Sequence, residues 1–536
     1  MKFCVSLLLG LLFVSSAYAD DHYPRNKDID IQRYRFLLEL NDQNDVMQAQ
    51  AQVTVKFLAP ATGFSLDLAN KNPEGKGMEV QAVSLNEQAQ GFVHQADRLK
   101  IELKEAAKAG DMKVFHIQYR GEPASGLNIG KNKYGDRVFF ADNWPNHGHQ
   151  WLPTIDHPSD KAAVEFIVIA PAQYSVIANG LKMEESYIDA NRKLTHWKEE
   201  VPLAVKVMVI GVAKFAMQES AKLNEVAITS WVFPQNRSEG FRDYAVAINP
   251  LTFFQQKIGP YPYKKLANVQ SKTRFGGLEN ANTIFYFENS VTGKGEQEGL
   301  VAHEIAHQWF GNSATENDWH HVWLSEGFAT YFTNLYLEHT YGRDRFLRQQ
   351  LADREKIIRY HQKVWRPIVD TEIQDPKNVL SPNTYEKGGW VLHMLRQDLG
   401  DEVFWQGIRA YYAKFAGKNA MSEDFQTAME QASGKDLKGF FQQWLYQAGY
   451  PKLSGTWSYD KANREVVLNL EQTGKDLFRF PLELALQMSD GKLQIQAINV
   501  SRAQETFKLK VDTAPKFISL DPNVRQLFEG KVEMKP

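Results

Sequence analysis

The sequence has almost no cysteine: Cys4 is the only one among 536 residues. A single cysteine cannot form an intramolecular disulfide, so a small disulfide scaffold is excluded and the chain must be held by its hydrophobic cores. An excess of charge is also lacking, because 62 Lys and Arg face 64 Asp and Glu, a net charge of -2. No global field therefore favours nucleic acid or an anionic membrane as a partner.

Long apolar runs are absent after the first twenty residues, so we expect no membrane anchor. The first run, Phe3 to Val14, is too short to span a bilayer comfortably. It follows Lys2 and precedes a small-residue site ending at Ala19, which is typical of a secretory signal peptide over residues 1–19. We therefore expect export to a periplasm or the extracellular space. Cys4 would leave with the signal, and the mature protein would have no cysteine.

The rest of the chain changes its hydrophobic period twice. Residues 20–215 alternate with period two, as in "AQAQVTVKF", and predict an N-terminal β domain. From about residue 240 the period lengthens, so residues 216–450 are expected to be mostly helical. Strand patterns return over 451–536 and predict a small C-terminal β domain. The predicted fold class is therefore multidomain α+β.

The stretch "LVAHEIAHQWFGN" carries the clearest chemistry in the chain. His303 and His307 are one helical turn apart and project from one face, where two imidazoles can bind Zn²⁺. Glu304 lies beside them and can reach a metal-bound water without being a ligand. Glu326, in "VWLSEGFATYF", is expected on the next helix as the third ligand. Two histidines and one glutamate leave a fourth position open for water, which predicts a zinc hydrolase.

Together, "HEIAHQWFGN" and "WLSEGFATY" resemble the zinc metallopeptidases of the aminopeptidase N and leukotriene hydrolase type, the gluzincin aminopeptidases. The resemblance implies one Zn²⁺ per chain, held by His303, His307 and Glu326, with Glu304 as the base that activates water. It also implies a thermolysin-like catalytic domain between the β domain and a C-terminal β-sandwich. The family's long C-terminal helical domain has no counterpart before Pro536, so we expect a more open cleft or one closed by a partner subunit.

The end of the peptide that is attacked is indicated by "GGLEN". The resembling family has a Gly-x-Met-Glu-Asn strand that pairs with substrate and whose Glu holds the free α-amine. The resemblance therefore makes Gly276, Gly277, Glu279 and Asn280 substrate-binding residues, with Glu279 as the amine anchor. Leu278 replaces the usual Met, which is a volume-conserving change. Tyr385, in "NTYEKGGW", is implied as the donor to the developing oxyanion.

One part of the family pattern is changed in this chain. Relatives place a Gln or Glu in the β domain as a second contact for the amine, shortly before a stretch that reads "LPTIDHP" here. Counting back from that stretch gives Asn143 or Trp144, and neither is charged. We expect Asn143 to assist Glu279 weakly and Trp144 to shape the first side-chain pocket. Gln150 is the alternative second contact.

These patterns predict an exported zinc aminopeptidase acting on peptides with a free N-terminus. An epoxide hydrolase of the same family is one alternative, but Leu380 stands where that branch carries another Tyr. A catalytically silent binding protein on the same fold is the other alternative, which the intact motifs disfavour. The preferred N-terminal residue and the oligomeric state are left open.

Overall fold

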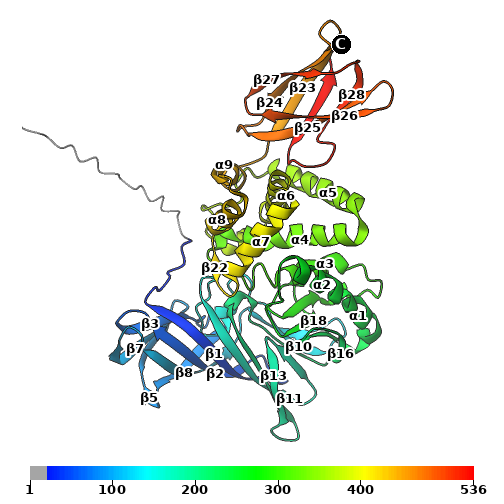
Figure 1. Cartoon of the computed structure of the whole chain (residues 1–536). Helices are drawn as coiled ribbons and strands as arrows, with labels where there is room; N and C mark the ends of the chain where they lie inside the picture. The colour runs from blue at the N-terminus through cyan, green and yellow to red at the C-terminus, as the bar shows by residue number, and fades with distance from the viewer. Residues whose placement is uncertain (1–20, 536) are drawn as a thin grey trace, which may run out of the picture.

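A computed structural model describes residues 21–535 and divides the molecule into three regions along its length (Figure 1). The β-rich N-terminal region lies at one end, the helices fill the middle, and the C-terminal strands form the other end. The predicted signal peptide and Cys4 lie outside the described residues. None of the helices within the described range is long and apolar enough to cross a membrane.

The N-terminal region is built on an eight-stranded sheet with the order β13-β14-β11-β1-β2-β8-β4-β5. The strands of this sheet follow the alternation of buried and more exposed side chains in the sequence. In β2, for example, every second side chain is buried, from Met47 to Phe57. The pair β1 and β11 is parallel, whereas the other pairs are antiparallel. The strands are β1 (Ile29–Glu39), β2 (Met47–Phe57), β4 (Gly77–Leu85), β5 (Gln88–Ala89), β8 (Met112–Glu122), β11 (Lys161–Pro171), β13 (Leu181–Tyr187) and β14 (Arg192–Ala204).

Two smaller sheets complete this region. The four-stranded sheet has the order β12-β15-β10-β9, with β9 (Leu127–Lys131), β10 (Arg137–Ala141), β12 (Ser175–Ala178) and β15 (Ile210–Ala213). The three-stranded sheet pairs β3 (Ala61–Asp67), β7 (Arg98–Ala107) and β6 (Gly91–Gln95). Strand β10 leads directly into the segment that carries Asn143 and Trp144.

The middle region begins with a five-stranded mixed sheet of order β16-β17-β18-β20-β19. The strands are β16 (Ala216–Leu223), β17 (Val226–Val232), β18 (Lys265–Ser271), β19 (Gly277–Leu278) and β20 (Thr283–Phe287). The sequence had indicated helices from about residue 240, so β18, β19 and β20 differ from the prediction. The reason is that β18 reads KLANVQS and buries all seven residues, polar and apolar alike, so its sequence shows neither an apolar run nor the alternation of a half-buried strand.

Helices make up most of the rest of the middle region. They are α1 (Arg237–Tyr244), α2 (Ile248–Lys257), α3 (Glu298–Ala306), α4 (Trp323–Tyr341), α5 (Arg343–His361), α6 (Gly388–Leu399), α7 (Asp401–Phe415), α8 (Ser422–Ser433) and α9 (Lys438–Phe441). Helices α1 and α2 lie between β17 and β18 in the chain, and the others follow the sheet. The short strands β21 (Thr315–Glu316) and β22 (Asn419–Ala420) pair between them. Antiparallel helices α4 and α5 are joined at Gly342, whose φ of 84° favours glycine.

The C-terminal region consists of two sheets, β27-β24-β23-β29 and β26-β25-β28. Their strands are β23 (Lys452–Asp460), β24 (Glu465–Gln472), β25 (Phe480–Met488), β26 (Leu493–Val500), β27 (Gln504–Lys510), β28 (Pro515–Leu520) and β29 (Glu529–Met534). His393 of α6 contacts this region, because its Nε2 lies 2.8 Å from the carbonyl oxygen of Val524. The arrangement agrees with a multidomain α+β architecture.

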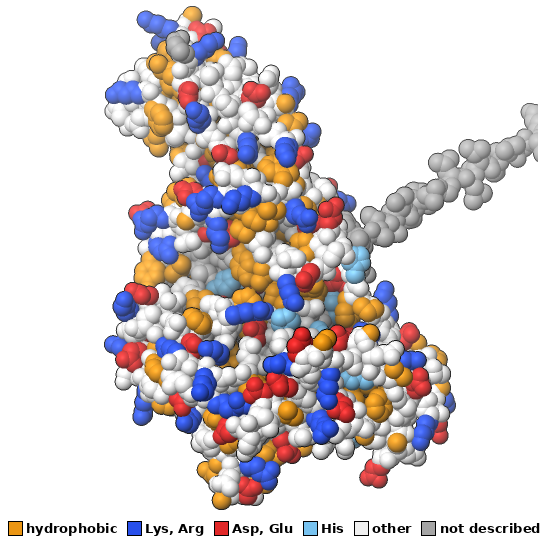
Figure 2. All heavy atoms as spheres, turned by 180° about the vertical axis from the view of Figure 1, so that it is seen from behind, with side chains coloured by type: hydrophobic (Ala, Val, Ile, Leu, Met, Phe, Trp, Pro, Cys, Tyr) orange, Lys and Arg blue, Asp and Glu red, His pale blue; other side chains and the backbone are white. Residues whose placement is uncertain are grey.

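Two lysines join the N-terminal region to the segment after α3. The ammonium of Lys206 lies 2.5 Å from the carboxylate of Glu316, and both side chains are almost fully buried. Lys161 donates to the carbonyl oxygens of Asn312 (3.1 Å) and Ser313 (2.7 Å). A buried charge is costly without a partner, so these contacts fix the β domain against the residues that follow the histidine motif. Histidine side chains gather at this level of the molecule (Figure 2).

Candidate metal centre and substrate cleft

Helix α3 presents His303 on its last turn, and His307 caps its C-terminal end. The two Nε2 atoms are 3.1 Å apart, so both rings face the same point. Nδ1 of His307 lies 3.2 Å from the carbonyl oxygen of Phe310, which can only accept. The Nδ1–H tautomer is therefore favoured, and the lone pair of Nε2 is left for a metal.

Gly311 allows Ser325 to approach the ring of His307. Its φ is +113°, and a Cβ atom there would lie 2.2 Å from Oγ of Ser325. That hydroxyl lies 3.0 Å from Nδ1 of His307. Glycine in "WFGN" therefore allows the chain to turn back closely enough for Ser325 to hold the ring. Ser325 also precedes the third predicted ligand in the chain.

Helix α4 supplies Glu326 from its first turn. Its Oε2 lies 3.2 Å from Nε2 of His307 and 3.5 Å from Nε2 of His303. This oxygen is buried and has no hydrogen-bond donor of its own. Within the described residues, His303, His307 and Glu326 are the cluster of histidine, cysteine and acidic side chains able to hold a metal, with ligand atoms within 4.8 Å of one another.

The charges of this cluster fit a divalent cation. Burial would raise the pKa of Glu326, but the two imidazoles outweigh it and lower that pKa. Burial would likewise lower the pKa of His307, but the Glu326 carboxylate outweighs it and raises the pKa to about 9. Burial lowers the pKa of His303 and keeps its lone pair available. The buried carboxylate thus attracts a positive charge between the rings, and two nitrogens with one oxygen suit Zn²⁺.

Glu304 lies beside the metal cluster on the same helix. Its side chain is only 4% exposed. Burial raises the pKa of its carboxyl well above the usual range, and the nearby Glu279 and Glu326 act in the same direction. A carboxylate with a raised pKa is a better base and can return its proton readily.

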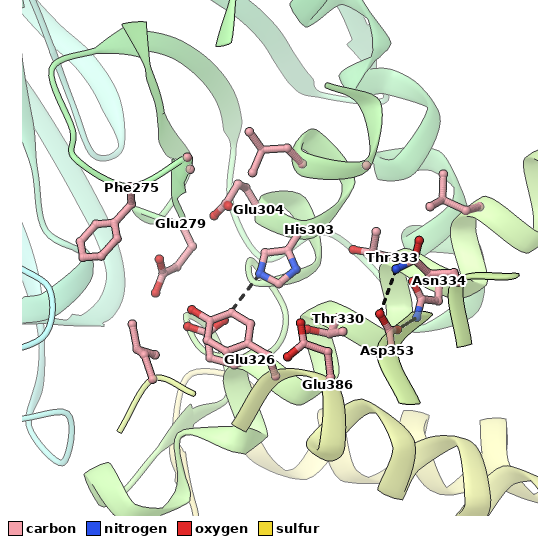
Figure 3. Close-up of a pocket in the computed structure, with 18 of the residues that line it drawn as sticks. Phe275, Glu279, His303, Glu304, Glu326, Thr330, Thr333, Asn334, Asp353 and Glu386 are labelled. Atoms are coloured by element: carbon pink, nitrogen blue, oxygen red, sulfur yellow. Dashed lines mark hydrogen bonds and ion pairs between the residues drawn. The ribbon is translucent and has the colours of Figure 1, made fainter. Parts of the chain in front are cut away.

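The edge strand β19 places Glu279 in the same cleft (Figure 3). The strand pairs antiparallel with β20 through Gly277 and Leu278. The carbonyl oxygen of Glu279 accepts hydrogen bonds from Gln308 (3.0 Å) and from Asn312 (2.6 Å). Its carboxyl oxygen Oε1 is buried without a donor, which leaves it ready for an ammonium group.

Gln308 and Asn312 were not singled out from the sequence. Both follow His307 closely in "HEIAHQWFGN", and both fix Glu279 by its main chain. The motif therefore does more than supply metal ligands, because its C-terminal half positions the residue expected to bind the amine.

Tyr385 enters the cleft from the π-helical turn η8 (Asn383–Lys387). Its ring stacks on His303 with centroids 6.1 Å apart and planes inclined by 13°. Burial, followed by the carboxylates of Glu326, Glu279 and Glu304, raises the pKa of this phenol well above 10. The hydroxyl therefore keeps its proton and can donate a hydrogen bond to an oxyanion.

Asn143 and Trp144, the two candidate residues in "ADNWPN", have different positions. Trp144 lines the cleft and is 6.5 Å from the ring of Phe275. Asn143 does not line it: its amide donates to the carbonyl oxygens of Val205 (3.1 Å) and Met208 (2.7 Å), and its oxygen accepts from the indole of Trp151. The predicted amine contact by Asn143 is therefore not formed, because this side chain is occupied inside the β domain.

The alternative contact, Gln150, is also placed elsewhere. Its amide lies 2.9 Å from Nε2 of His149, and it is not among the residues that line the cleft. Gly276, Gly277 and Glu279 do line it, whereas the side chain of Asn280 is buried outside it without hydrogen bonds.

The cleft has a volume of about 480 Å³ and continues beyond the metal cluster between α4 and α5. Glu279 and Phe275 lie on one side of the cluster, and Thr330, Asn334 and Asp353 lie on the other (Figure 3). This second half was not predicted. Thr330 and Asn334 are one and two helical turns after Glu326, a spacing that could have suggested them. Asp353 comes from α5 and had no such signal.

Comparisons with known proteins agree with this arrangement. The family model "Peptidase M1 N-terminal domain" matches residues 30–204, and "Peptidase family M1 domain" matches residues 243–444. The probable aminopeptidase 2 of Sulfurisphaera tokodaii is 27% identical over 394 residues, which cover 69% of this chain and 50% of that protein. The glutamyl aminopeptidase of Sus scrofa is 28% identical over 342 residues, 59% of this chain and 35% of that protein.

A third relative matches a longer part of this chain. The leucyl aminopeptidase of Saccharolobus solfataricus is 23% identical over 442 residues, which cover 77% of this chain and 54% of that protein. The chain thus spans from about a third to about a half of the length of these relatives. Both family models match in order along the chain, and the second includes the metal cluster, Glu304 and Tyr385. The chain therefore belongs to peptidase family M1.

Proposed function

We propose that this protein is a zinc-dependent aminopeptidase that removes residues from the N-terminus of peptides. The observation that carries the proposal is the position of Glu279, whose unpaired buried oxygen shares one cleft with the metal cluster and Glu304. An α-ammonium held there places the first peptide bond, and no internal bond, beside the metal.

His303, His307 and Glu326 would hold the metal, which supplies Lewis acidity toward the scissile carbonyl and lowers the pKa of water. Glu304 takes one proton from the attacking water as the oxygen bonds to the carbonyl carbon. Tyr385 donates a hydrogen bond to the carbonyl oxygen as it becomes negative. When the C–N bond breaks, Glu304 gives its proton to the leaving nitrogen, so the base is regenerated.

The N-terminal sequence supports export of this enzyme, with the signal peptide removed after Ala19. Within the described residues the far end of the cleft is lined mainly by polar side chains, Asn334, Arg345, Gln349 and Asp353, beside the apolar Leu337. This polar lining is unsuited to a lipid chain and disfavours the epoxide hydrolase alternative. The assembled metal cluster disfavours a silent binding protein.

The experiment that tests the proposal is Glu304→Gln. The amide keeps the shape of the side chain but cannot take a proton, so kcat should fall by about 10²- to 10⁴-fold. Zinc content should stay near one per chain, because Glu304 is not a ligand. A Glu304→Gln enzyme that cleaves aminoacyl-coumarin substrates at near wild-type turnover would remove Glu304 from the reaction.

A further inference from the structure

The half of the cleft beyond the metal cluster contains two buried carboxyl groups that the proposed reaction does not use. Asp353 of α5 is 6% exposed and Glu386 of η8 is 8% exposed. Both line the same cleft as His303 and Glu304. Figure 3 shows Glu386 beside Thr330, and Asp353 further from the metal cluster, next to Asn334.

Glu386 presents an acceptor that has no donor. Its Oε1 is paired with the ammonium of Lys356, which approaches from outside the cleft and is 55% exposed. Its Oε2 is buried and has no hydrogen-bond partner. A buried acceptor without a donor is unfavourable, so a donor that enters the cleft and reaches this oxygen gains the bond.

Asp353 has only neutral hydrogen-bond partners, although Lys356 and Arg345 lie near enough to lower its pKa by their charge. Its Oδ1 accepts from the amide of Gln349 and its Oδ2 from the amide of Asn334, both at 2.9 Å. Each carboxylate oxygen can accept a further hydrogen bond. Burial raises the pKa of Asp353 and of Glu386, and an added cation would favour their charged forms.

Helix geometry gives the distance of this compartment from the reacting bond. Glu326, Thr330 and Asn334 follow one another at four-residue intervals on α4, so Thr330 lies about 6 Å and Asn334 about 12 Å along the axis from the metal ligand. The first residue of the substrate would be held on the opposite side by Glu279. The second residue therefore points into the compartment, and only a long side chain reaches its end.

We propose that Asp353 and Glu386 form the subsite for the second residue of the peptide, and that this subsite selects lysine or arginine there. The inference rests on the proposed aminopeptidase activity. Among the described residues that line the cleft, Arg345 is the single arginine or lysine, and its guanidinium donates to the amide oxygen of Gln349. Its positive charge acts on Asp353, so it weakens the selection for a second cation.

The test uses peptides that share one first residue, chosen as the one best cleaved from coumarin, and differ in the second: Lys, Arg, Leu or Glu. We expect kcat/KM for Lys and Arg to exceed that for Leu by about 10- to 100-fold, with Glu the slowest. Asp353→Asn and Glu386→Gln should each bring the Lys to Leu ratio toward one. Arg345→Gln should raise it, a change of opposite sign that no loss of folding can imitate.

Glu355→Gln is the matched control, because this glutamate lies on the same helix and its side chain is 71% exposed. It should leave the ratio unchanged. Aminoacyl-coumarin has no second residue, so its cleavage reports the proposed function separately. The subsite would be overturned if the wild-type enzyme released coumarin but had a Lys to Leu ratio of kcat/KM near one, or preferred Glu. The proposed aminopeptidase activity would not be affected by that result. Failure to release coumarin or any first residue would overturn both.

Discussion

Two glycines bring the metal ligand and the predicted oxyanion donor together. Gly327 follows Glu326 on α4, and Gly388 follows the turn that carries Tyr385. A Cβ atom at residue 327 would lie 2.9 Å from both the carbonyl carbon and Cα of Gly388. These are backbone atoms, so no side-chain rotation relieves the contact. Gly327→Ala must therefore push α4 and the Tyr385 turn apart.

The size of the effect follows from this contact. Carbon atoms pack at about 3.5–4.0 Å, so the segments must separate by about 0.6 Å or more. Overpacking costs about 1–3 kcal/mol. Alanine in place of glycine in a helix returns about 1 kcal/mol. We therefore expect the free energy of unfolding to fall by about 0–2 kcal/mol, but kcat/KM to fall by about 10- to 100-fold, because catalysis tolerates misplacement poorly.

Gly389→Ala is the matched control. Its Cβ would lie 3.5 Å from Cγ2 of Thr330, an ordinary contact, so it should be as active as wild type and at least as stable. The assay is hydrolysis of aminoacyl-coumarin, with zinc content and denaturant unfolding measured on the same samples. If Gly327→Ala matched Gly389→Ala in activity and stability, the close approach would not determine the geometry of the site.

Four further outcomes are expected. Tyr385→Phe should lower kcat by about 10²- to 10³-fold without a change in melting temperature. Because the pKa of this tyrosine is raised well above 10, the phenol should stay protonated at pH 9. A loss of wild-type rate near pH 9 that is absent in the variant would show that the phenol ionises there, and would contradict its role. Lys206→Met should lower the free energy of unfolding by about 3–5 kcal/mol, since it leaves Glu316 buried and unpaired, and urea unfolding that matches wild type would refute this. Burial lowers the pKa of His393 to about 3, so the unfolded chain takes up this proton first and the free energy of unfolding should fall as pH drops from about 6.5 toward 3, by up to about 1.4 kcal/mol per pH unit. His393→Gln should remove that slope in urea titrations, and an equal slope in both proteins would assign it to other groups. A chelator should abolish activity and lower the melting temperature, zinc should restore both, and full activity in the metal-free protein would exclude a metalloenzyme.

The metal cluster was accessible to sequence reasoning because a helix fixes the directions of its side chains. His303 and His307 are one turn apart, so their common face did not depend on the rest of the fold. Glu326 required only that the next helix pack against α3. The same reasoning could have reached Thr330, since it lies on the face of Glu326 one turn later.

Residues placed by long-range packing could not be found in this way. Asn143 and Trp144 are neighbours in an irregular segment, and only the fold decides that one side chain enters the core and the other the cleft. Asp353 reaches the cleft because α5 packs along α4, a pairing that the sequence does not encode locally. Strand β18 of the middle region was missed because it buries polar and apolar side chains alike, so its sequence has no alternation.

The central claim is that Glu279 binds the free amine and thereby restricts cleavage to the first bond. The most direct measurement compares kcat/KM for one well-cleaved peptide with its N-acetylated form, using the wild-type enzyme and Glu279→Gln. We predict that acetylation abolishes cleavage by wild type and that Glu279→Gln loses activity mainly on the free peptide. Equal cleavage of the free and the acetylated peptide by wild type would contradict the account and indicate an endopeptidase.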